Sequence, residues 1–168
     1  MKWIYNNSEE FDVPVDAVGF VYIIKRIPET IVETKYAHGF TKWDFSDKIY
    51  IGNKLLTSTT KRKVGKRALE KLHKETGDRR KGQRVVRVTK ESPWRSYNGS
   101  NPELQKEIEA NPELFRKEIL HWCFSRKNMS FWETAEQIRH RVWEVPSWNN
   151  HIQNWWIKDI VKPKTEEK

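Results

Sequence analysis

Apolar and β-branched residues gather in short runs that predict strands. Residues 19–27 (GFVYIIKRI) form an almost continuous apolar run, typical of a buried strand, and residues 48–52 (KIYIG) form a second, shorter run. Residues 115–123 (FRKEILHWC) alternate in part and predict a third core strand, while RVVRVT at 84–89 indicates a further short strand. Residues 28–47 form a long polar connection between the first two strands.

Helical signals lie between and after these runs. The pattern predicts helices over 61–76, over a short stretch after Pro93, over 102–110 behind an Asn101 N-cap, and over FWETAEQIRHRVWEV behind a Ser130 cap. The expected fold is therefore α+β, with a small, mainly antiparallel, three-stranded central sheet flanked by helices. We divide the chain into an N-terminal arm (1–17), a domain (18–155) with a basic insertion (61–90), and a C-terminal tail (156–168).

Charge is concentrated in one stretch of this 168-residue chain. The formal net charge is +9, and residues 61–90 hold 13 of the 32 Lys and Arg but only 3 of the 23 acids. Such a block favours a polyanionic partner, because each phosphate that it neutralises releases counterions. A solvated helix face or a loop is the alternative interpretation of the same residues.

Cysteine content and hydropathy exclude several classes of protein. The single cysteine, Cys123, cannot support a disulfide framework or a Cys-rich zinc site, so we expect a reducing, cytoplasmic setting. No apolar run approaches the ~20 residues that cross a bilayer, so we expect no membrane partner. The histidines are scattered, without the spacing of a zinc site or an HNH-type site.

Two strand-borne tyrosines carry the strongest motif. Val21-Tyr22-Ile23 and Tyr50-Ile51-Gly52 stand on the first two expected strands, and here the sequence resembles the GIY-YIG nuclease family. WRSYNGS at 94–100, the helix at 102–110, FRKEIL, SFWETAEQ with Glu133 and SWNNHI follow in the family's order over residues 19–152. The last segments are most similar to small phage-type or mobile-element members.

The resemblance implies a metal-dependent DNA endonuclease with a defined catalytic set. Tyr22 would orient or deprotonate the attacking water, Tyr50 would support it, and Glu133 would hold Mg²⁺ or Mn²⁺. Many members have an arginine about ten residues after the second-motif tyrosine, where this chain has Thr60 beside Lys61 and Arg62. We therefore assign Arg95 as the catalytic arginine, with Arg62 as the alternative.

DNA is the expected partner. The residues predicted to bind it are Lys54, Lys61, Arg62, Lys63, Lys66, Arg67, Asn149 and Asn150. Target choice would come from the insertion, the arm, a homodimer or a separate targeting partner.

Each catalytic residue also has an ordinary structural interpretation. The tyrosines could be plain strand aromatics, and Glu133, three residues after Ser130, could complete a capping box. The competing functions are a catalytically inactive nucleic-acid-binding module on the same scaffold, and a basic RNA-binding or scaffold protein of another fold.

Overall fold

The computed structural model describes residues 1–28, 46–63, 65–76, 85–153 and 155–156. The long connection predicted over 28–47 and the tail lie largely outside these residues. In chain order the elements are β1 (Trp3–Ile4), β2 (Gly19–Arg26), β3 (Lys48–Leu55), β4 (Thr57–Lys63), α1 (Lys66–Thr76), β5 (Val85–Glu91), α2 (Pro102–Ala110), the 3₁₀ turn η3 (Pro112–Leu114), β6 (Phe115–Cys123), α3 (Arg126–Arg139), β7 (His151–Ile152) and β8 (Trp155–Trp156).

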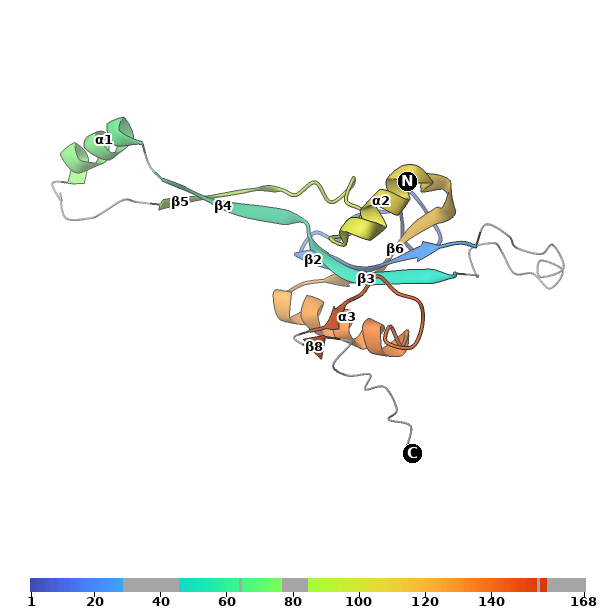
Figure 1. Cartoon of the computed structure of the whole chain (residues 1–168). Coiled ribbons are helices and arrows are strands. Elements are labelled where there is room, and N and C mark those ends of the chain that lie inside the picture. Colours follow the sequence, from blue (N-terminus) through green and yellow to red (C-terminus); the bar gives the residue numbers. More distant parts are fainter. Residues whose placement is uncertain (29–45, 64, 77–84, 154, 157–168) are drawn as a thin grey trace, which may run out of the picture. The chain divides into compact units, whose positions relative to one another are not determined.

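The chain divides into two compact units. One unit comprises residues 1–56 and 93–168, and the other comprises residues 57–92. In the first unit a four-stranded sheet has the order β1-β6-β2-β3, with α2 and α3 on opposite faces (Figure 1). Within the described ranges, none of the helices has the length and apolar character needed to cross a membrane.

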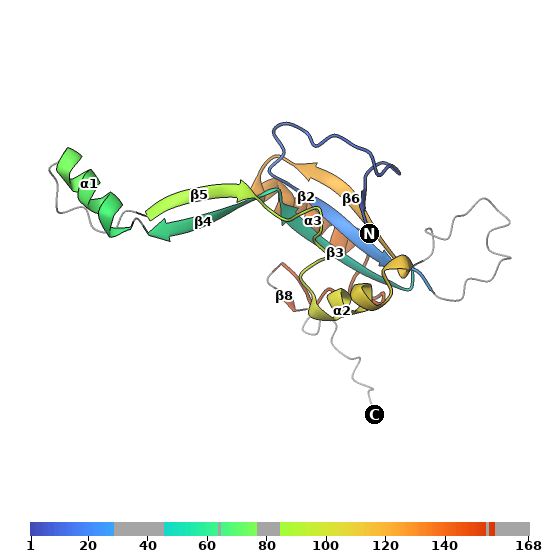
Figure 2. The ribbon, with the colours of Figure 1, turned by 90° about the horizontal axis from the view of Figure 1, so that it is seen from above.

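The sheet is mixed and four-stranded, which corrects the three-stranded antiparallel prediction. The three predicted core strands are present, and β2 pairs antiparallel with both β3 and β6 (Figure 2). The fourth strand comes from the predicted N-terminal arm, where Trp3 and Ile4 pair in parallel with Lys117 and Glu118. The arm is held because Trp3 is buried and its indole Nε1 donates to the Trp94 carbonyl at 2.7 Å.

Alternation along β2 divides its side chains between two cores. Phe20, Tyr22 and Ile24 join the core that α2 covers, while Val21 and Ile23 join the core that α3 covers. Both faces of β2 are therefore buried, which explains its nearly continuous apolar run.

A bulge between β2 and β6 reverses the alternation of β6. Val21 pairs with His121, but Tyr22 pairs with Ile119, so Leu120 is the additional residue. The irregularity explains why residues 115–123 alternate only in part, and it lies directly beside Tyr22.

Three helix predictions need correction. Helix α1 begins at Lys66, because residues 61–63 belong to β4 and pair with β5. Residues 94–96 form a turn, with Tyr97 N bonded to the Trp94 carbonyl, and no helix follows Pro93 there. Helix α3 begins behind Ser125, whose hydroxyl accepts from Asn128 N, and it ends at Arg139, well before Pro146.

Candidate active site

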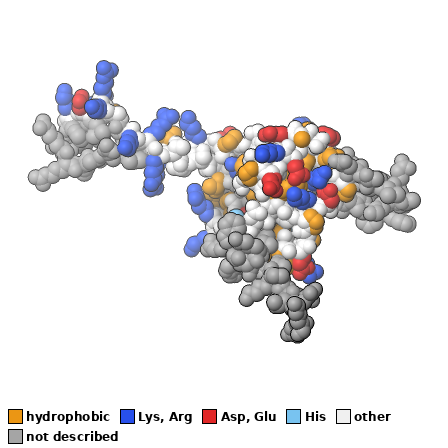
Figure 3. Space-filling model, in the orientation of Figure 1, with side chains coloured by type: hydrophobic (Ala, Val, Ile, Leu, Met, Phe, Trp, Pro, Cys, Tyr) orange, Lys and Arg blue, Asp and Glu red, His pale blue; other side chains and the backbone are white. Residues whose placement is uncertain are grey.

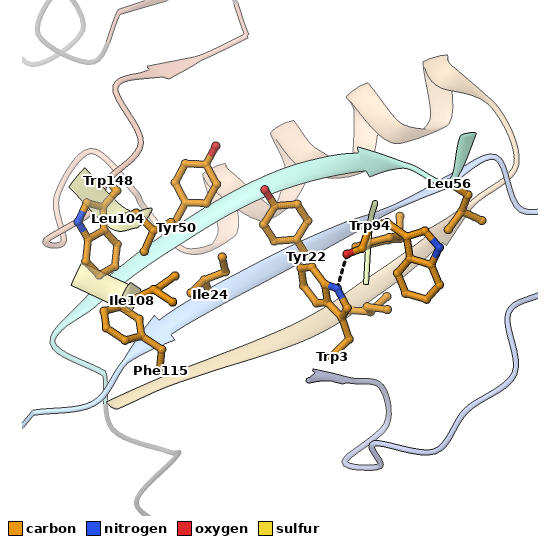
Figure 4. Packing of buried hydrophobic residues seen from close by; sticks show 12 residues of the cluster. Trp3, Tyr22, Ile24, Tyr50, Leu56, Trp94, Leu104, Ile108, Phe115 and Trp148 are labelled. Atoms are coloured by element: carbon orange, nitrogen blue, oxygen red, sulfur yellow. Dashed lines mark hydrogen bonds between the residues drawn. The ribbon is translucent and has the colours of Figure 1, made fainter. Parts of the chain in front are cut away.

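Tyr22 and Tyr50 lie on the same face of neighbouring strands. Tyr22 pairs with Gly52 and Ile24 pairs with Tyr50, so the two tyrosines share a face, and their ring centroids are 6.1 Å apart. Figure 4 shows both hydroxyls pointing in the same general direction, across β3. This geometry confirms the expected placement of the two motif tyrosines.

Gly52 makes room for the Tyr22 ring. A Cβ at this position would lie 2.7 Å from Tyr22 Oη and 2.9 Å from Tyr22 Cζ, which is closer than real Cβ contacts. Because Gly52 has no side chain, the Tyr22 ring can lie across the edge strand β3 with its hydroxyl over that strand. The glycine of the second motif thus serves the tyrosine of the first.

The two hydroxyls have different surroundings. Tyr22 Oη is buried and makes no hydrogen bond of good geometry with a described residue, although the Tyr97 hydroxyl lies near enough to contribute to its raised pKa. Tyr50 Oη, in contrast, is 2.9 Å from Ser100 Oγ. Burial raises the pKa of Tyr22 well above its usual value, and the nearby Tyr50 acts in the same direction. Burial also raises the pKa of Tyr50, against a lowering effect of its hydrogen bond with Ser100. Both phenols are therefore neutral at pH 7 and available as donors.

Glu133 does not cap helix α3. Since α3 begins at Arg126, Glu133 lies in its interior, and the capping-box interpretation is wrong. Its Oε2 accepts from Asn53 Nδ2 at 2.6 Å, a contact that joins α3 to β3. Burial raises the pKa of Glu133, while the Asn53 hydrogen bond and the charge of His151 lower it. The same carboxylate acts electrostatically on both Tyr22 and Tyr50.

A hollow of about 270 Å³ lies between Tyr50 and Glu133. Its other lining residues are Ile51, Ser100, Asn101, Pro102, Gln137, Trp148, Asn149, Asn150 and His151. The lining brings together side chains from β3, α3 and the segments around 100 and 150. Gln137 and His151 lie within the SFWETAEQ and SWNNHI segments, but sequence analysis assigned no role to them or to Asn53, and only their contacts reveal them as part of this site.

Asn149 positions the second motif. Its Oδ1 accepts from Ile51 N at 2.9 Å and its Nδ2 donates to the Ile51 carbonyl at 2.7 Å, so the amide pairs with the edge strand as another strand would. This bonding gives the Asn149 side chain a positioning role, and the DNA contact expected from the sequence stays a prediction. Asn150 is exposed and lines the hollow, where it remains a candidate DNA contact.

The predicted arginine lies elsewhere. Arg95 is exposed, its guanidinium lies 4.3 Å from the Trp94 ring centroid, and it lines a different hollow with Trp3 and Glu9. Arg62 stands on β4, in the other unit. Lys54, in contrast, lies 3.8 Å from the Tyr97 ring centroid, and that ring packs against Tyr22. The structure therefore places Lys54 over the ring that packs against Tyr22, while Arg95 lines a different hollow.

Lys117 fixes the turn that carries Tyr97. It is fully buried beneath the sheet face, and its Nζ donates to the Tyr97 carbonyl and to Asn98 Oδ1, both at 3.1 Å. Burial lowers its pKa to about 8. Sequence analysis missed Lys117 because a lysine within a strand pattern is ordinarily exposed.

The donor set suits a hard cation bound by few protein ligands. No group of three His, Cys, Asp or Glu side chains gathers for a metal within the described part of the chain. One carboxylate beside a polar hollow is compatible with Mg²⁺ or Mn²⁺, because Mg²⁺ keeps several waters and often takes only one or two protein carboxylates. Glu133 is the residue that fits this requirement.

The unit formed by residues 57–92 is a basic hairpin with a helix. Strands β4 and β5 pair antiparallel from Thr57–Glu91 to Lys63–Val85. The described Lys and Arg side chains of this unit are all exposed: Lys61, Arg62, Lys63, Lys66, Arg67, Lys71, Lys74, Arg87 and Lys90. Figure 3 shows such side chains projecting from more than one side of the hairpin. Cross-strand pairing places Lys61, Lys63 and Arg87 on one face, and Arg62 and Lys90 on the other.

The paired tyrosines, the glutamate and the order of elements define a class of nuclease domain. Residues 3–160 match the family model described as "Putative endonuclease segE, GIY-YIG domain". The match covers nearly the whole chain, so the protein belongs to the GIY-YIG nuclease family. Neither the curated proteins nor the solved structures contain a match.

Proposed function

We propose that this protein hydrolyses phosphodiester bonds in DNA with the help of a divalent cation, Mg²⁺ or Mn²⁺, bound at Glu133. The observation that supports the proposal is that Tyr50 and Glu133 line one hollow, with Tyr22 packed against Tyr50. The Tyr22 and Tyr50 rings are 6.1 Å apart, and the Glu133 charge acts on both. Family membership supports nuclease chemistry for this arrangement.

The residues of the site have separate roles in the proposed reaction. Glu133 binds the cation through the oxygen that Asn53 leaves free, because Asn53 occupies Oε2. When bound, the cation supplies positive charge that stabilises the leaving 3′ oxygen. Tyr22 donates its unpartnered hydroxyl to orient the attacking water, and Tyr50, fixed by Ser100, holds its own hydroxyl beside it.

Lys54 contributes positive charge at the phosphate. Burial lowers the pKa of its ammonium, and its Nζ is held over the Tyr97 ring next to Tyr22. A cation at this point can contact non-bridging phosphate oxygens. Arg95 lines a different hollow, so we assign this role to Lys54.

The basic unit holds the duplex by its phosphates. The nine Lys and Arg side chains described in this unit are all exposed, which suits phosphate contacts that position DNA without recognising its sequence. Of the cationic residues predicted from the sequence to bind DNA, Lys54 lies in the first unit, and the others fall within this unit: Lys61, Arg62, Lys63, Lys66 and Arg67.

The test is the nicking of supercoiled plasmid with Mg²⁺ by the wild type and by Glu133→Gln. Gln retains the volume and can still accept from Asn53, so the variant removes the charge and little else. We expect nicking to fall by at least about 100-fold, the range of a lost catalytic group. Glu109→Gln, at an exposed position on α2, is the matched control and should cut normally.

Two outcomes contradict the proposal. Normal cutting by Glu133→Gln would show that the carboxylate holds no catalytic cation. DNA binding by the wild type without cleavage, under Mg²⁺ and under Mn²⁺, would favour the inactive nucleic-acid-binding module.

A further inference from the structure

Gln137 is a buried amide with an unused oxygen. It lies one helical turn after Glu133 on α3, at the spacing that places two side chains on the same helix face. The residue is only 3% exposed, and its Oε1 is buried without a hydrogen-bond partner among the described residues. An unsatisfied buried acceptor costs free energy, so its presence calls for an explanation.

Gln137 lines the same space as the carboxylate. Gln137 and Glu133 both line the hollow of about 270 Å³, and both line a second hollow of about 190 Å³ with Ser130, His151 and Gln153. The side chains of this second hollow are all polar. A polar hollow beside an orphaned acceptor is suited to a hydrated ligand.

Two neighbouring side chains of this hollow already have partners. Gln153 Nε2 donates to Thr134 Oγ1 at 2.6 Å and to the Ser130 carbonyl at 3.1 Å. Glu133 Oε2 accepts from Asn53. Gln137 Oε1 is without a hydrogen bond to a described residue, and the Asn53 contact at Oε2 leaves Glu133 Oε1 for another ligand.

We propose that Gln137 is a positioning residue of the cation site, whose side-chain oxygen accepts a hydrogen bond from a water bound to the cation at Glu133. This inference rests on the proposed function and adds a second protein group to the site. An amide can turn either end toward the hollow, and water bound to a cation selects the oxygen because such water is a strong donor. Mg²⁺ and Mn²⁺ retain waters, which gives the amide a partner without direct ligation.

The test measures Mn²⁺ binding to the full chain without DNA by isothermal titration calorimetry. Gln137→Met retains the length and loses the acceptor, and we expect its Mn²⁺ dissociation constant to rise about 10-fold or more, as for other groups that orient metal ligands. Gln137→Glu retains an acceptor and should bind Mn²⁺ at least as tightly as the wild type. Gln105→Met is the control, because this amide on α2 bonds the Gly99 carbonyl.

Thermal melting without metal separates this role from a structural one. Gln137→Met removes an unsatisfied buried acceptor, so its melting temperature should equal or exceed that of the wild type. A fall in melting temperature with unchanged Mn²⁺ affinity would overturn the inference. If Gln137→Met does not fold, the Glu variant decides, and a 10-fold weaker Mn²⁺ affinity of that variant overturns the inference.

Glu133→Gln distinguishes the two levels of the argument. Loss of Mn²⁺ binding in Glu133→Gln, with wild-type binding in Gln137→Met, rejects the role of Gln137 and leaves the proposed function standing. Wild-type Mn²⁺ binding in Glu133→Gln rejects the cation site itself, and the proposed function with it.

Discussion

Removing the hydroxyl from each motif tyrosine should change stability in opposite directions. Tyr22 Oη is buried without a partner among the described residues, while Tyr50 Oη bonds Ser100 Oγ at 2.9 Å. Tyr22→Phe therefore removes an unsatisfied polar atom, and Tyr50→Phe removes a hydrogen bond. The two substitutions are chemically identical, so the difference between them isolates the environment of each hydroxyl.

The magnitudes follow from the cost of desolvation. Leaving a buried hydroxyl unsatisfied costs about 1–3 kcal/mol, whereas a typical hydrogen bond contributes about 0.5–1.5 kcal/mol. For a chain of this length, 1 kcal/mol corresponds to a melting-temperature change of roughly 2–4 °C. We expect Tyr22→Phe to melt at least about 2 °C higher than the wild type, and Tyr50→Phe to melt about 1–6 °C lower.

The assay combines thermal melting in metal-free buffer with plasmid nicking in Mg²⁺. Tyr22→Phe should lose about 100-fold or more in nicking rate although it is the more stable protein, because the missing hydroxyl oriented the water. Tyr5→Phe is the control, since Tyr5 packs on Phe11 and Trp122 away from the motif tyrosines.

A lower melting temperature for Tyr22→Phe would refute this reasoning, because it would mean that the hydroxyl has a partner that stabilises the fold. A more stable variant with full nicking activity would keep the structural argument and remove Tyr22 from catalysis.

Three other predictions concern the strand edge, the carboxylate and the hairpin. Gly52→Ala should lower the nicking rate about 100-fold by displacing the Tyr22 ring. Gly65→Ala is the control and should cut normally, because a Cβ there meets nothing within 4 Å. Equal nicking rates of the two variants would contradict the role given to Gly52. Asn53→Ala removes a hydrogen bond that lowers the pKa of Glu133. Because the ionised carboxylate binds the cation, the acid limb of the profile of nicking rate against pH should move to higher pH. An unmoved acid limb would count against this role of Asn53. On the hairpin, Gln at Lys61, Lys63 and Arg87, which share one face, should flatten the slope of log K for DNA binding against log salt concentration by about 2–3. Gln at Arg62 and Lys90, on the other face, should change this slope little. Equal changes per residue would mean that no single face binds DNA.

The sequence alone determined the elements whose signals are local. The apolar run of β2, the YIG strand and the Asn101 cap of α2 were predicted within a few residues, because burial on both faces and capping chemistry leave a direct pattern. The motif order also indicated the family and placed Tyr22 and Tyr50 on two of the core strands.

Tertiary structure decided what depends on distant partners. Trp3 and Ile4 became a strand only because β6 offered an edge, and Asn149 acts through the backbone of Ile51, 98 residues away. Glu133 resembled a helix cap because Ser130 stood three residues before it, yet Ser125 begins the helix and Asn53 holds the carboxylate. Local propensity cannot record such contacts, since each depends on the position of a partner that the fold alone brings near.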